Sequence, residues 1–459
     1  MLRRINPIFN VFYIEPGNLP LDSREEVVVS NCLRDNNRKI ISLLGHPLSI
    51  TGVEGKGRLI LLVDIGTTKI AYQVIDDKGN ILREKIIMNP LMSYGADIIT
   101  RLSKIIENSV SLSEMREKLH YTIMKIANEN NVIMAAFAGN SVNQSILLGL
   151  PIDYLAVKPY QPLLRGPFIG VLGDCTPFYA APFIGGFVGA DAFSNVAAVE
   201  YMGLEKPYLI IDIGTNTEVI VGTDREEARF YVTSTPAGPA FEGHIESGAG
   251  VGFPGISSVK IREIYSDKIL FDYTVEGSGK PVGLLGSGVI SLLAELLRYK
   301  VIDEKGRIIK GYRRINGVKT ITIVNGSETG IGRPITFSQL DIRELQKAIA
   351  AVKTSWQLLL RESNIEVSDL KWVILTGTFG SSISIDDALF LGLIPKVEKN
   401  KIMIAGNMVL SGLKTLVLDK DHEEGMRQLL KKTKNIDLAE TREFMSTWIR
   451  NLDFNSVGS

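Results

Sequence analysis

The feature that most constrains the fold is a short turn that occurs twice in the chain. Residues 64–68 read Asp-Ile-Gly-Thr-Thr and residues 212–216 read Asp-Ile-Gly-Thr-Asn, and each follows an apolar run of strand length. A second β-rich run, a polar turn and a third run follow each copy, and the third runs are Ile81–Met88 and Ala228–Thr233. The pattern predicts two antiparallel three-stranded meanders with a glycine turn between their first two strands.

Helical periodicity follows both meanders. It predicts helices at residues 95–108, 112–130 and 287–298, and Asp341 is expected to cap a longer helix that ends near Glu362. Short apolar runs predict further strands at residues 132–137, 372–376 and 401–404. The mostly charged tail from His422 to about Leu452 is predicted to be helical, with a solvated outer face. This succession of strands and helices indicates an α/β fold.

The two glycine turns have the chemistry of phosphate-binding loops. Glycine allows backbone conformations closed to other residues and lets a phosphate approach closely. Successive backbone N–H groups then converge on the anion, and the neighbouring threonine hydroxyls add donors. Asp64 and Asp212 end their strands, where carboxylates that contact the waters around Mg²⁺ suit a metal–nucleotide site. One such loop alone fits a structural turn equally well, but two copies favour ATP with Mg²⁺.

Further glycine clusters lie at the ends of predicted strands and helices. Residues 234–240 close the second meander, residues 286–288 open a helix, and residues 377–380 end a strand where a nucleoside would meet bare backbone. Each cluster taken alone also fits a tight turn or a close helix contact. Asp64 and Asp212 are predicted to serve catalysis and to bind the metal. The residues predicted to bind the nucleotide are Gly66, Thr67, Thr68, Gly214, Thr215, Asn216, Gly238, Gly286, Ser287, Gly377, Phe379 and Gly380.

Charge and cysteine content exclude several other classes of protein. Lys plus Arg and Asp plus Glu both number 51, so a general attraction to nucleic acid or to anionic lipid has no support. Cys32 and Cys175 are too few for a disulfide framework or a four-thiolate iron–sulfur cluster within this chain. The apolar stretch at residues 166–192 is interrupted by proline, aspartate and glycine, which favours core and loop over a membrane span. Without a secretory pattern at the start, we expect a cytoplasmic protein with no membrane partner.

The pattern changes at residue 58. Residues 1–57 contain short mixed segments and are predicted to form a small N-terminal module whose role is not readable. The first meander opens a lobe predicted at residues 58–205, and the second opens a lobe predicted at residues 206–459.

These motifs resemble those of the superfamily of actin, sugar kinases and heat-shock chaperones, the ASKHA fold. Residues 64–68 resemble its first phosphate motif, residues 212–216 its second, and residues 375–380 its adenosine motif. Gly139-Asn140 and residues 286–288 resemble its two connecting motifs. The resemblance implies an α/β fold of two ribonuclease-H-like lobes with a nucleotide cleft between them.

One branch of this superfamily is matched more closely, the reductive activators of corrinoid proteins. The runs that resemble it occur in the family's order from about Leu59 to Leu452, and they are residues 89–90, 94–101, 139–141, 212–218, 234–242, 286–288, 335–336, 341–346 and 391–395. Family members use ATP to drive an uphill electron transfer to the cobalt of an inactivated corrinoid protein. The resemblance therefore implies an ATPase that couples lobe closure to work on a corrinoid protein.

The chain departs from this family in two places. Activators of this type carry an iron–sulfur cluster, which two distant cysteines cannot supply. The chain thus resembles the ATPase part alone, and a separate redox protein is expected to supply the electrons. Thr376-Gly377-Thr378 stands where the family tends to have Ala-Gly-Gly, a change that affects nucleoside affinity. Family members tend to dimerise, so the resemblance also implies a homodimer.

Two other functions remain open on the sequence. A small-molecule kinase of the same fold needs a carboxylate base near a substrate hydroxyl, and Glu218, Glu242 and Asp191 are the candidates. A nucleotide-gated binding protein with little turnover needs only the phosphate loops. His244, beside Glu242 in a glycine-rich loop, is interpreted as a polar loop residue.

Overall fold

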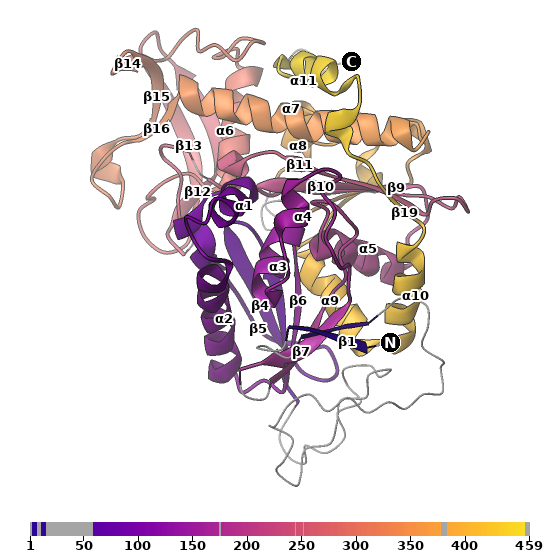
Figure 1. Cartoon of the computed structure of the whole chain (residues 1–459). Helices are drawn as coiled ribbons and strands as arrows, with labels where there is room; N and C mark the ends of the chain where they lie inside the picture. Colours follow the sequence, from indigo (N-terminus) through magenta and orange to yellow (C-terminus); the bar gives the residue numbers. More distant parts are fainter. Residues whose placement is uncertain are drawn as a thin grey trace. The chain divides into compact units, whose positions relative to one another are not determined.

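The computed structural model describes residues 2–6, 11–14, 58–173, 176–243, 245–250, 252–377 and 383–454. The chain divides into two compact units (Figure 1). Unit 1 contains Met1–Leu204, Arg225–Phe230 and Asn407–Asn435, and unit 2 contains Glu205–Asp224, Tyr231–Gly406 and Ile436–Ser459. Residues 407–435 therefore cluster with unit 1, whereas the sequence predicts that everything after residue 205 belongs to the second lobe.

Unit 1 is built on an eight-stranded mixed sheet with the order β1-β2-β7-β8-β6-β3-β4-β5. Its central strand β3 pairs antiparallel with β4 and parallel with β6. The strands of this sheet are β1 (Leu2–Asn6), β2 (Val11–Ile14), β3 (Ile60–Ile65), β4 (Lys69–Ile75), β5 (Ile81–Met88), β6 (Met134–Gly139), β7 (Phe168–Leu172) and β8 (Thr176–Ala180). The predicted first meander is confirmed, because β3, β4 and β5 are consecutive and antiparallel and β5 has the predicted bounds.

The beginning of the chain extends this sheet. β1 pairs antiparallel with β2, and β2 pairs antiparallel with β7 through Phe12 and Tyr13. These two strands are therefore part of unit 1 and do not stand apart as a module. The rest of the predicted module at residues 1–57 lies outside the described residues.

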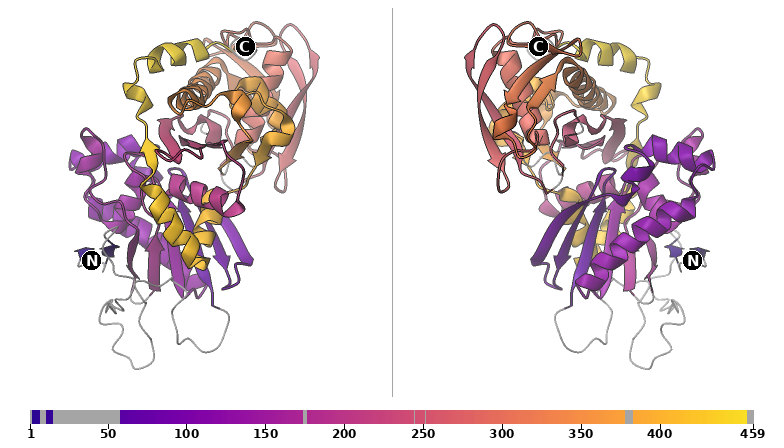
Figure 2. Two further views of the ribbon diagram at one scale, coloured as in Figure 1. Left: turned by 90° about the vertical axis from the view of Figure 1, so that its right-hand side faces the viewer. Right: turned by 90° about the vertical axis from the view of Figure 1, so that its left-hand side faces the viewer.

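Helices cover both faces of the unit 1 sheet. α2 lies on one face and α9 on the other (Figure 2). α9 packs against β3 and β6, and it also packs against α5. The helices of this unit are α1 (Ile98–Ile106), α2 (Leu112–Glu129), α3 (Ser141–Leu148), α4 (Asp153–Ala156), α5 (Ala190–Met202), α9 (Met408–Leu418) and α10 (Lys420–Leu430), and the short strand β19 (Thr433–Asn435) follows them.

Unit 2 repeats the plan with a sheet in which β18, β17, β9, β10 and β11 are neighbours in that order. β9 pairs antiparallel with β10 and parallel with β17, so the predicted second glycine turn again joins two antiparallel strands. The strands of this sheet are β9 (Tyr208–Asp212), β10 (Asn216–Gly222), β11 (Phe230–Pro236), β17 (Trp372–Thr376) and β18 (Ile402–Ile404). β17 has the predicted bounds.

Two smaller sheets and a set of α-helices complete the described part of unit 2. The small sheets are antiparallel, β12 (Gly255–Ile264) with β13 (Ile269–Glu276), and β14 (Arg313–Ile315) with β15 (Val318–Val324) and β16 (Ile335–Ser338). α6 packs on β12, and α7 packs on β10. The helices are α6 (Gly286–Arg298), α7 (Gln339–Glu362), α8 (Ile385–Leu391) and α11 (Phe444–Asn451).

The cores form around the two strands that lead into the glycine turns. Ile60, Leu61 and Leu62 of β3 and the residues Tyr208–Ile211 of β9 are completely buried. Each of these strands has a parallel neighbour and is covered on both faces, which explains why it reads as a continuous apolar run instead of an alternating one. The turn that follows each strand is therefore carried on a rigid element.

Two local predictions are wrong. The N-cap of α7 is Ser338, and Asp341 instead completes a capping box in which its carboxylate accepts the Ser338 N–H at 2.8 Å. The tail after His422 is not one helix, because α10 ends at Leu430 and α11 begins only at Phe444. The intervening residues include β19, which a helical pattern does not anticipate.

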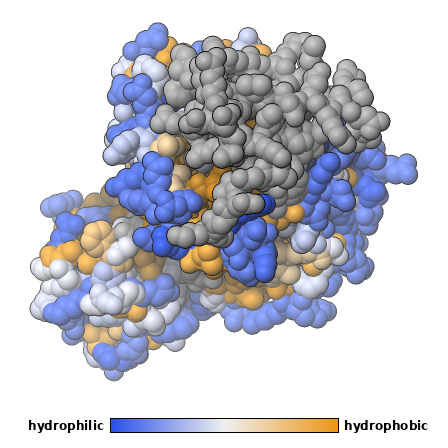
Figure 3. Space-filling model, turned by 90° about the horizontal axis from the view of Figure 1, so that it is seen from below, coloured by the Kyte–Doolittle hydropathy of each residue, from blue (hydrophilic) through white to orange (hydrophobic). Residues whose placement is uncertain are grey.

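None of the helices in the described part of the chain has the length and hydrophobicity needed to cross a membrane. On the face shown in Figure 3, hydrophilic and hydrophobic residues are interspersed. The exposed large hydrophobic side chains include Ile81, Leu82, Ile86 and Met88, all on the edge strand β5. Arg83, Glu84 and Lys85 lie between them, and charges on an edge strand oppose edge-to-edge aggregation.

The contact between α5 and α9 provides a test of unit 1. A Cβ added at Gly412 would lie 1.8 Å from the Ser194 carbonyl oxygen. We therefore expect Gly412→Ala to lower the free energy of unfolding by about 1–3 kcal/mol, because the two helices must move apart. The measurement is chemical denaturation followed by circular dichroism.

Gly425→Ala is the matched control for this prediction. Gly425 is an exposed residue inside α10, and nothing lies within 4 Å of an added Cβ. Because alanine is the better helix former, this variant should be more stable by about 0.5–1 kcal/mol. Equal effects of the two substitutions would contradict the close helix contact.

Candidate functional site

The first glycine turn, residues 64–68, is called the first loop and joins β3 to β4. Asp64 ends this buried strand and stands directly opposite Ala71 of β4 and Ala138 of β6. Directly opposite residues share a face of the sheet, so the carboxylate has a methyl group on either side of it. Two small neighbours leave space around Asp64 for another group.

Glycine is required at position 66. A Cβ there would lie 2.6 Å from the Lys69 carbonyl oxygen, because the hairpin closes tightly across this residue. The φ angle of Gly66 is not in the left-handed region, so the constraint is steric crowding. Any side chain at this position would have to open the loop.

Three polar side chains hold the first loop through its carbonyl groups. Asn143 Nδ2 donates to the carbonyl of residue 65 at 3.3 Å, and Asn89 Nδ2 donates to the carbonyl of residue 66 at 2.7 Å. The Arg101 guanidinium donates to the carbonyl of residue 67 at 2.5 Å. In a planar trans peptide the N–H points opposite to the C=O. The N–H groups of residues 66, 67 and 68 therefore point away from these three donors, as in an anion-binding nest.

Arg101 is the centre of this support. Its side chain is completely buried, and it donates to the Gly95 carbonyl at 3.1 Å and to Asn143 Oδ1 at 2.8 Å as well as to the loop. A buried guanidinium presents its donors in a fixed fork. Arg101 thus fixes α1, α3 and the first loop relative to one another within unit 1.

The end of β6 contributes a further contact. Asn140 caps α3 by accepting the Asn143 N–H at 2.9 Å, and its Nδ2 donates to Thr67 Oγ1 at 3.1 Å. The predicted connecting motif Gly139-Asn140 therefore lies against the first loop, and both Thr67 and Thr68 are buried.

Asn407 is a site residue that the sequence analysis missed. It caps α9 by accepting the Leu410 N–H at 2.9 Å, and its Nδ2 donates to Asp64 Oδ2 at 2.6 Å. The bond holds the Asp64 carboxylate in one orientation. The only signal in the sequence is Gly406-Asn407 ahead of an apolar helix, which predicts a helix cap and does not reveal its partner.

The second glycine turn, residues 212–216, joins β9 to β10, and together with the adjacent Thr217 it is called the second loop. Its Thr215 carbonyl accepts the Gly238 N–H at 2.9 Å. Gly377 has a φ of +100°, and a Cβ there would lie 2.6 Å from Asp212 Oδ1. The structure thus brings the predicted residues Gly238 and Gly377 against the second loop.

A second carboxylate stands beside Asp212. Glu218 of β10 is directly opposite Asp212 in strand register, so both side chains lie on one face of the sheet. Glu218 is buried and accepts a hydrogen bond from Ser234 Oγ at 3.0 Å. Asp191, another candidate base, accepts the N–H of the adjacent Ala192 at the start of α5. No group of three or more His, Cys, Asp or Glu side chains that could bind a metal occurs among the described residues.

The second loop also carries buried polar atoms without partners. Within the described part of the chain, Asn216 Nδ2 and Thr217 Oγ1 are buried and form no hydrogen bond. An unsatisfied buried donor costs about 1–3 kcal/mol, so such atoms are rarely retained without use. Phosphate oxygens are strong acceptors, and the second loop therefore fits a phosphorylated ligand.

Of the remaining predicted residues, two begin a helix and two are not described. Gly286 and Ser287 form the first turn of α6. A Cβ at Gly288 would lie 2.0 Å from the Ile256 carbonyl oxygen, so this cluster permits close packing of α6 on β12. Phe379 and Gly380 of the adenosine motif, like His244, lie outside the described residues.

Comparison with known proteins gives two matches to family models. One, described as the C-terminal domain of RACo, the ASKHA domain, matches residues 206–458, which is more than half of the 459-residue chain. The other, described as the RACo middle region, matches residues 59–204.

Two curated proteins and one solved structure are similar over long stretches. The corrinoid activation enzyme RamQ of Eubacterium limosum is 29% identical over 424 residues, which are 85% of this chain and 69% of that protein. The [Co(II) methylated amine-specific corrinoid protein] reductase of Methanosarcina barkeri is 28% identical over 291 residues, 59% of this chain and 50% of that protein. The structure of a reductive activator for corrinoid, iron-sulfur protein has a TM-score of 0.79 and 26% identity, covering 88% of this chain and 67% of that one. These matches confirm the predicted resemblance and the ASKHA fold.

The support of the first loop by Arg101 can be tested by stability. We expect Arg101→Leu to lower the free energy of unfolding by about 3 kcal/mol, because buried carbonyl groups lose a charged donor. Arg83→Leu is the control, since Arg83 lies on the exposed strand β5, where it donates to Asn130 Oδ1 at 2.7 Å. Urea denaturation of both variants is the measurement, and an equal loss in the two would refute the bracing role.

Proposed function

This chain belongs to the family of reductive activators of corrinoid proteins, and we propose from that membership that it binds and hydrolyses ATP with Mg²⁺. Nucleotide-dependent closure of its two lobes then does work on a corrinoid protein, and a separate redox protein supplies the electron. The homodimer that the family resemblance implies is part of the proposal.

One observation carries the nucleotide part of this proposal. The carbonyl groups of three consecutive residues of the first loop are held by Asn143, Asn89 and Arg101, which turns the following N–H groups to the opposite side. A structural hairpin turn does not need three side-chain donors from three separate segments. An anion-binding nest does, because its amide groups must be preorganised against their mutual repulsion.

The chain's own residues divide the work in the following way. Amide groups and the threonines of the first loop bind phosphate oxygens, and Asn216 and Thr217 of the second loop supply the donors that are otherwise unsatisfied. Asp64, oriented by Asn407, and Asp212 would hold Mg²⁺ through its waters. The ion, when bound, neutralises charge on the phosphates. Catalysis then consists of positioning and charge stabilisation.

The proposed activity has two chemical steps, ATP hydrolysis and reduction of cobalt. In hydrolysis, a water oxygen forms a bond to the γ-phosphorus while the bond from that phosphorus to the bridging oxygen of ADP breaks, and the water releases a proton to the solvent. In reduction, one electron passes from the reduced redox protein to the Co(II) of the corrinoid protein, which becomes Co(I). The names of the two curated relatives, a corrinoid activation enzyme and a Co(II) corrinoid-protein reductase, support this second part.

The nucleotide part is tested by calorimetry and phosphate release. The unaltered chain should bind ATP in the presence of Mg²⁺. Asp64→Asn and Asp212→Asn should each lower the rate of hydrolysis by about 100-fold or more, because the metal waters lose a charged contact. Both variants should unfold at a temperature close to that of the parent. Absence of ATP binding by the folded parent chain would end the proposal.

The corrinoid part is tested by spectroscopy of cobalt. The probe is the methylated-amine-specific corrinoid protein in its Co(II) state, mixed with a one-electron reductant, this chain and ATP. We expect Co(I) to accumulate only when ATP and this chain are both present, and Asp212→Asn to abolish the effect. If ATP is hydrolysed but no Co(I) forms with any corrinoid protein of this type, the proposed ATPase activity is retained. The proposal that a corrinoid protein is the partner is then wrong.

A further inference from the structure

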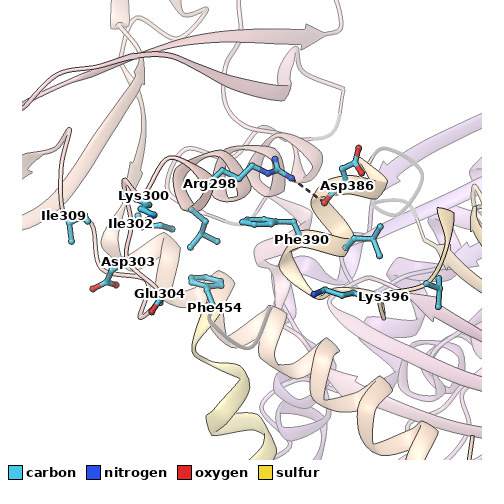
Figure 4. A pocket seen from close by; sticks show the side chains of 13 residues that line it. Arg298, Lys300, Ile302, Asp303, Glu304, Ile309, Asp386, Phe390, Lys396 and Phe454 are labelled. Carbon is cyan, nitrogen blue, oxygen red and sulfur yellow. Dashed lines mark hydrogen bonds between the residues drawn. The ribbon is translucent and has the colours of Figure 1, made fainter. Parts of the chain in front are cut away.

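Unit 2 contains a hollow that the nucleotide hypothesis does not use. Its volume is about 970 Å³, and the side chains around it come from the end of α6, the loop after α6, α8, the loop after α8 and Phe454 (Figure 4). None of the residues that line it is among those predicted to bind nucleotide or metal. The volume lies at the upper end of the range of about 300–1,000 Å³ that is typical of small-molecule sites.

Apolar and aromatic side chains form most of the wall. Phe390 and Phe454 lie close to the centre of the view in Figure 4, and Ile302 lies on the left. Phe454 and Ile302 are almost completely buried. The Arg298 guanidinium lies over the Phe390 ring, 4.6 Å from its centroid, and so fixes one aromatic wall. Such a lining favours a ligand with a planar aromatic body.

Most charges around the hollow are already paired inside the protein. Arg298 forms an ion pair with Asp387 at 2.6 Å, and Asp386 forms one with Lys399 at 2.5 Å. On the opposite rim, the Asp303 carboxylate accepts the N–H of residue 307 at 2.7 Å and closes a turn. Glu304 beside it is also engaged in an interaction.

Lys300 and Lys396 are different. Both are exposed residues at the hollow, and the side chain of neither forms a hydrogen bond or ion pair with any other residue that the structure describes. Burial, and then the positive charge of Lys396, lower the pKa of the neighbouring Lys353 to about 8. The side of the hollow at Lys396 therefore has a positive potential that an anion would relieve.

We propose that this hollow binds a small anionic molecule with an aromatic body, its rings against Phe390 and Phe454 and its anionic group at Lys396. The inference stands on unit 2 alone and is independent of ATP hydrolysis. A ligand of this class has an apolar ring system that can pack on the two phenylalanines. It also has a negative charge that can pair with the lysine side chain beside them.

The test uses 1-anilinonaphthalene-8-sulfonate, an aromatic anion whose fluorescence rises in apolar sites, with the full chain. N-phenyl-1-naphthylamine, which has the same rings without the sulfonate, is the neutral comparison. Lys396→Gln should weaken binding of the sulfonate about tenfold, as expected for loss of one charged contact, and leave the neutral probe unchanged. Phe390→Ala should weaken binding of both.

Lys125→Gln is the matched control, because Lys125 is an exposed lysine on α2 in unit 1. It should leave both probes unaffected. Thermal unfolding of every variant separates loss of the site from loss of the fold. Sulfonate binding that is indifferent to Lys396→Gln and Phe390→Ala in folded variants, or no sulfonate binding at all, would overturn the assignment.

Discussion

The hydrogen bonds that Arg101, Asn89 and Asn143 donate to the carbonyls of the first loop are the constraint on which the site in unit 1 depends. They give partners to the carbonyl groups of three consecutive residues, and in each peptide the N–H group then points the other way. A guanidinium at zero exposure is costly to desolvate, so the fold retains it only where its donors are used. The loop is therefore preorganised by the protein before any ligand arrives.

The two loops, which share a sequence motif, are held by different contacts. In the first loop the support comes from side chains, whereas the second loop is held by backbone contacts, from Gly238 to Thr215 and between Ile213 and Thr376. A side chain at position 377 would collide with Asp212. This crowding alone requires glycine there, independently of any contact with a nucleoside. The duplicated sequence motif thus specifies the turn, and each unit supplies its own bracing.

The duplicated turn predicts the local structure well, because alternation between apolar runs and turn residues is set by neighbours in sequence. The bounds of Ile81–Met88 and Trp372–Thr376 agree for that reason. The same pattern does not reveal that residues 407–435 return to unit 1, since an apolar helix face does not specify which sheet it covers. The bond from Asn407 to Asp64 joins residues 343 apart, and the crowding at Gly412 depends on another helix. Such contacts depend on tertiary packing, which local periodicity does not encode.

The unsatisfied atoms of the second loop have a thermodynamic consequence. Asn216 Nδ2 and Thr217 Oγ1 are buried without partners in the described structure, and each such atom lowers the stability of the ligand-free chain. A phosphate that accepts from them would recover this free energy on binding, in addition to its own contacts. Ligand binding would then stabilise unit 2 in proportion to the logarithm of ligand concentration. Part of the stabilising effect of a phosphorylated ligand should therefore fall on β9 and β10, where these atoms lie.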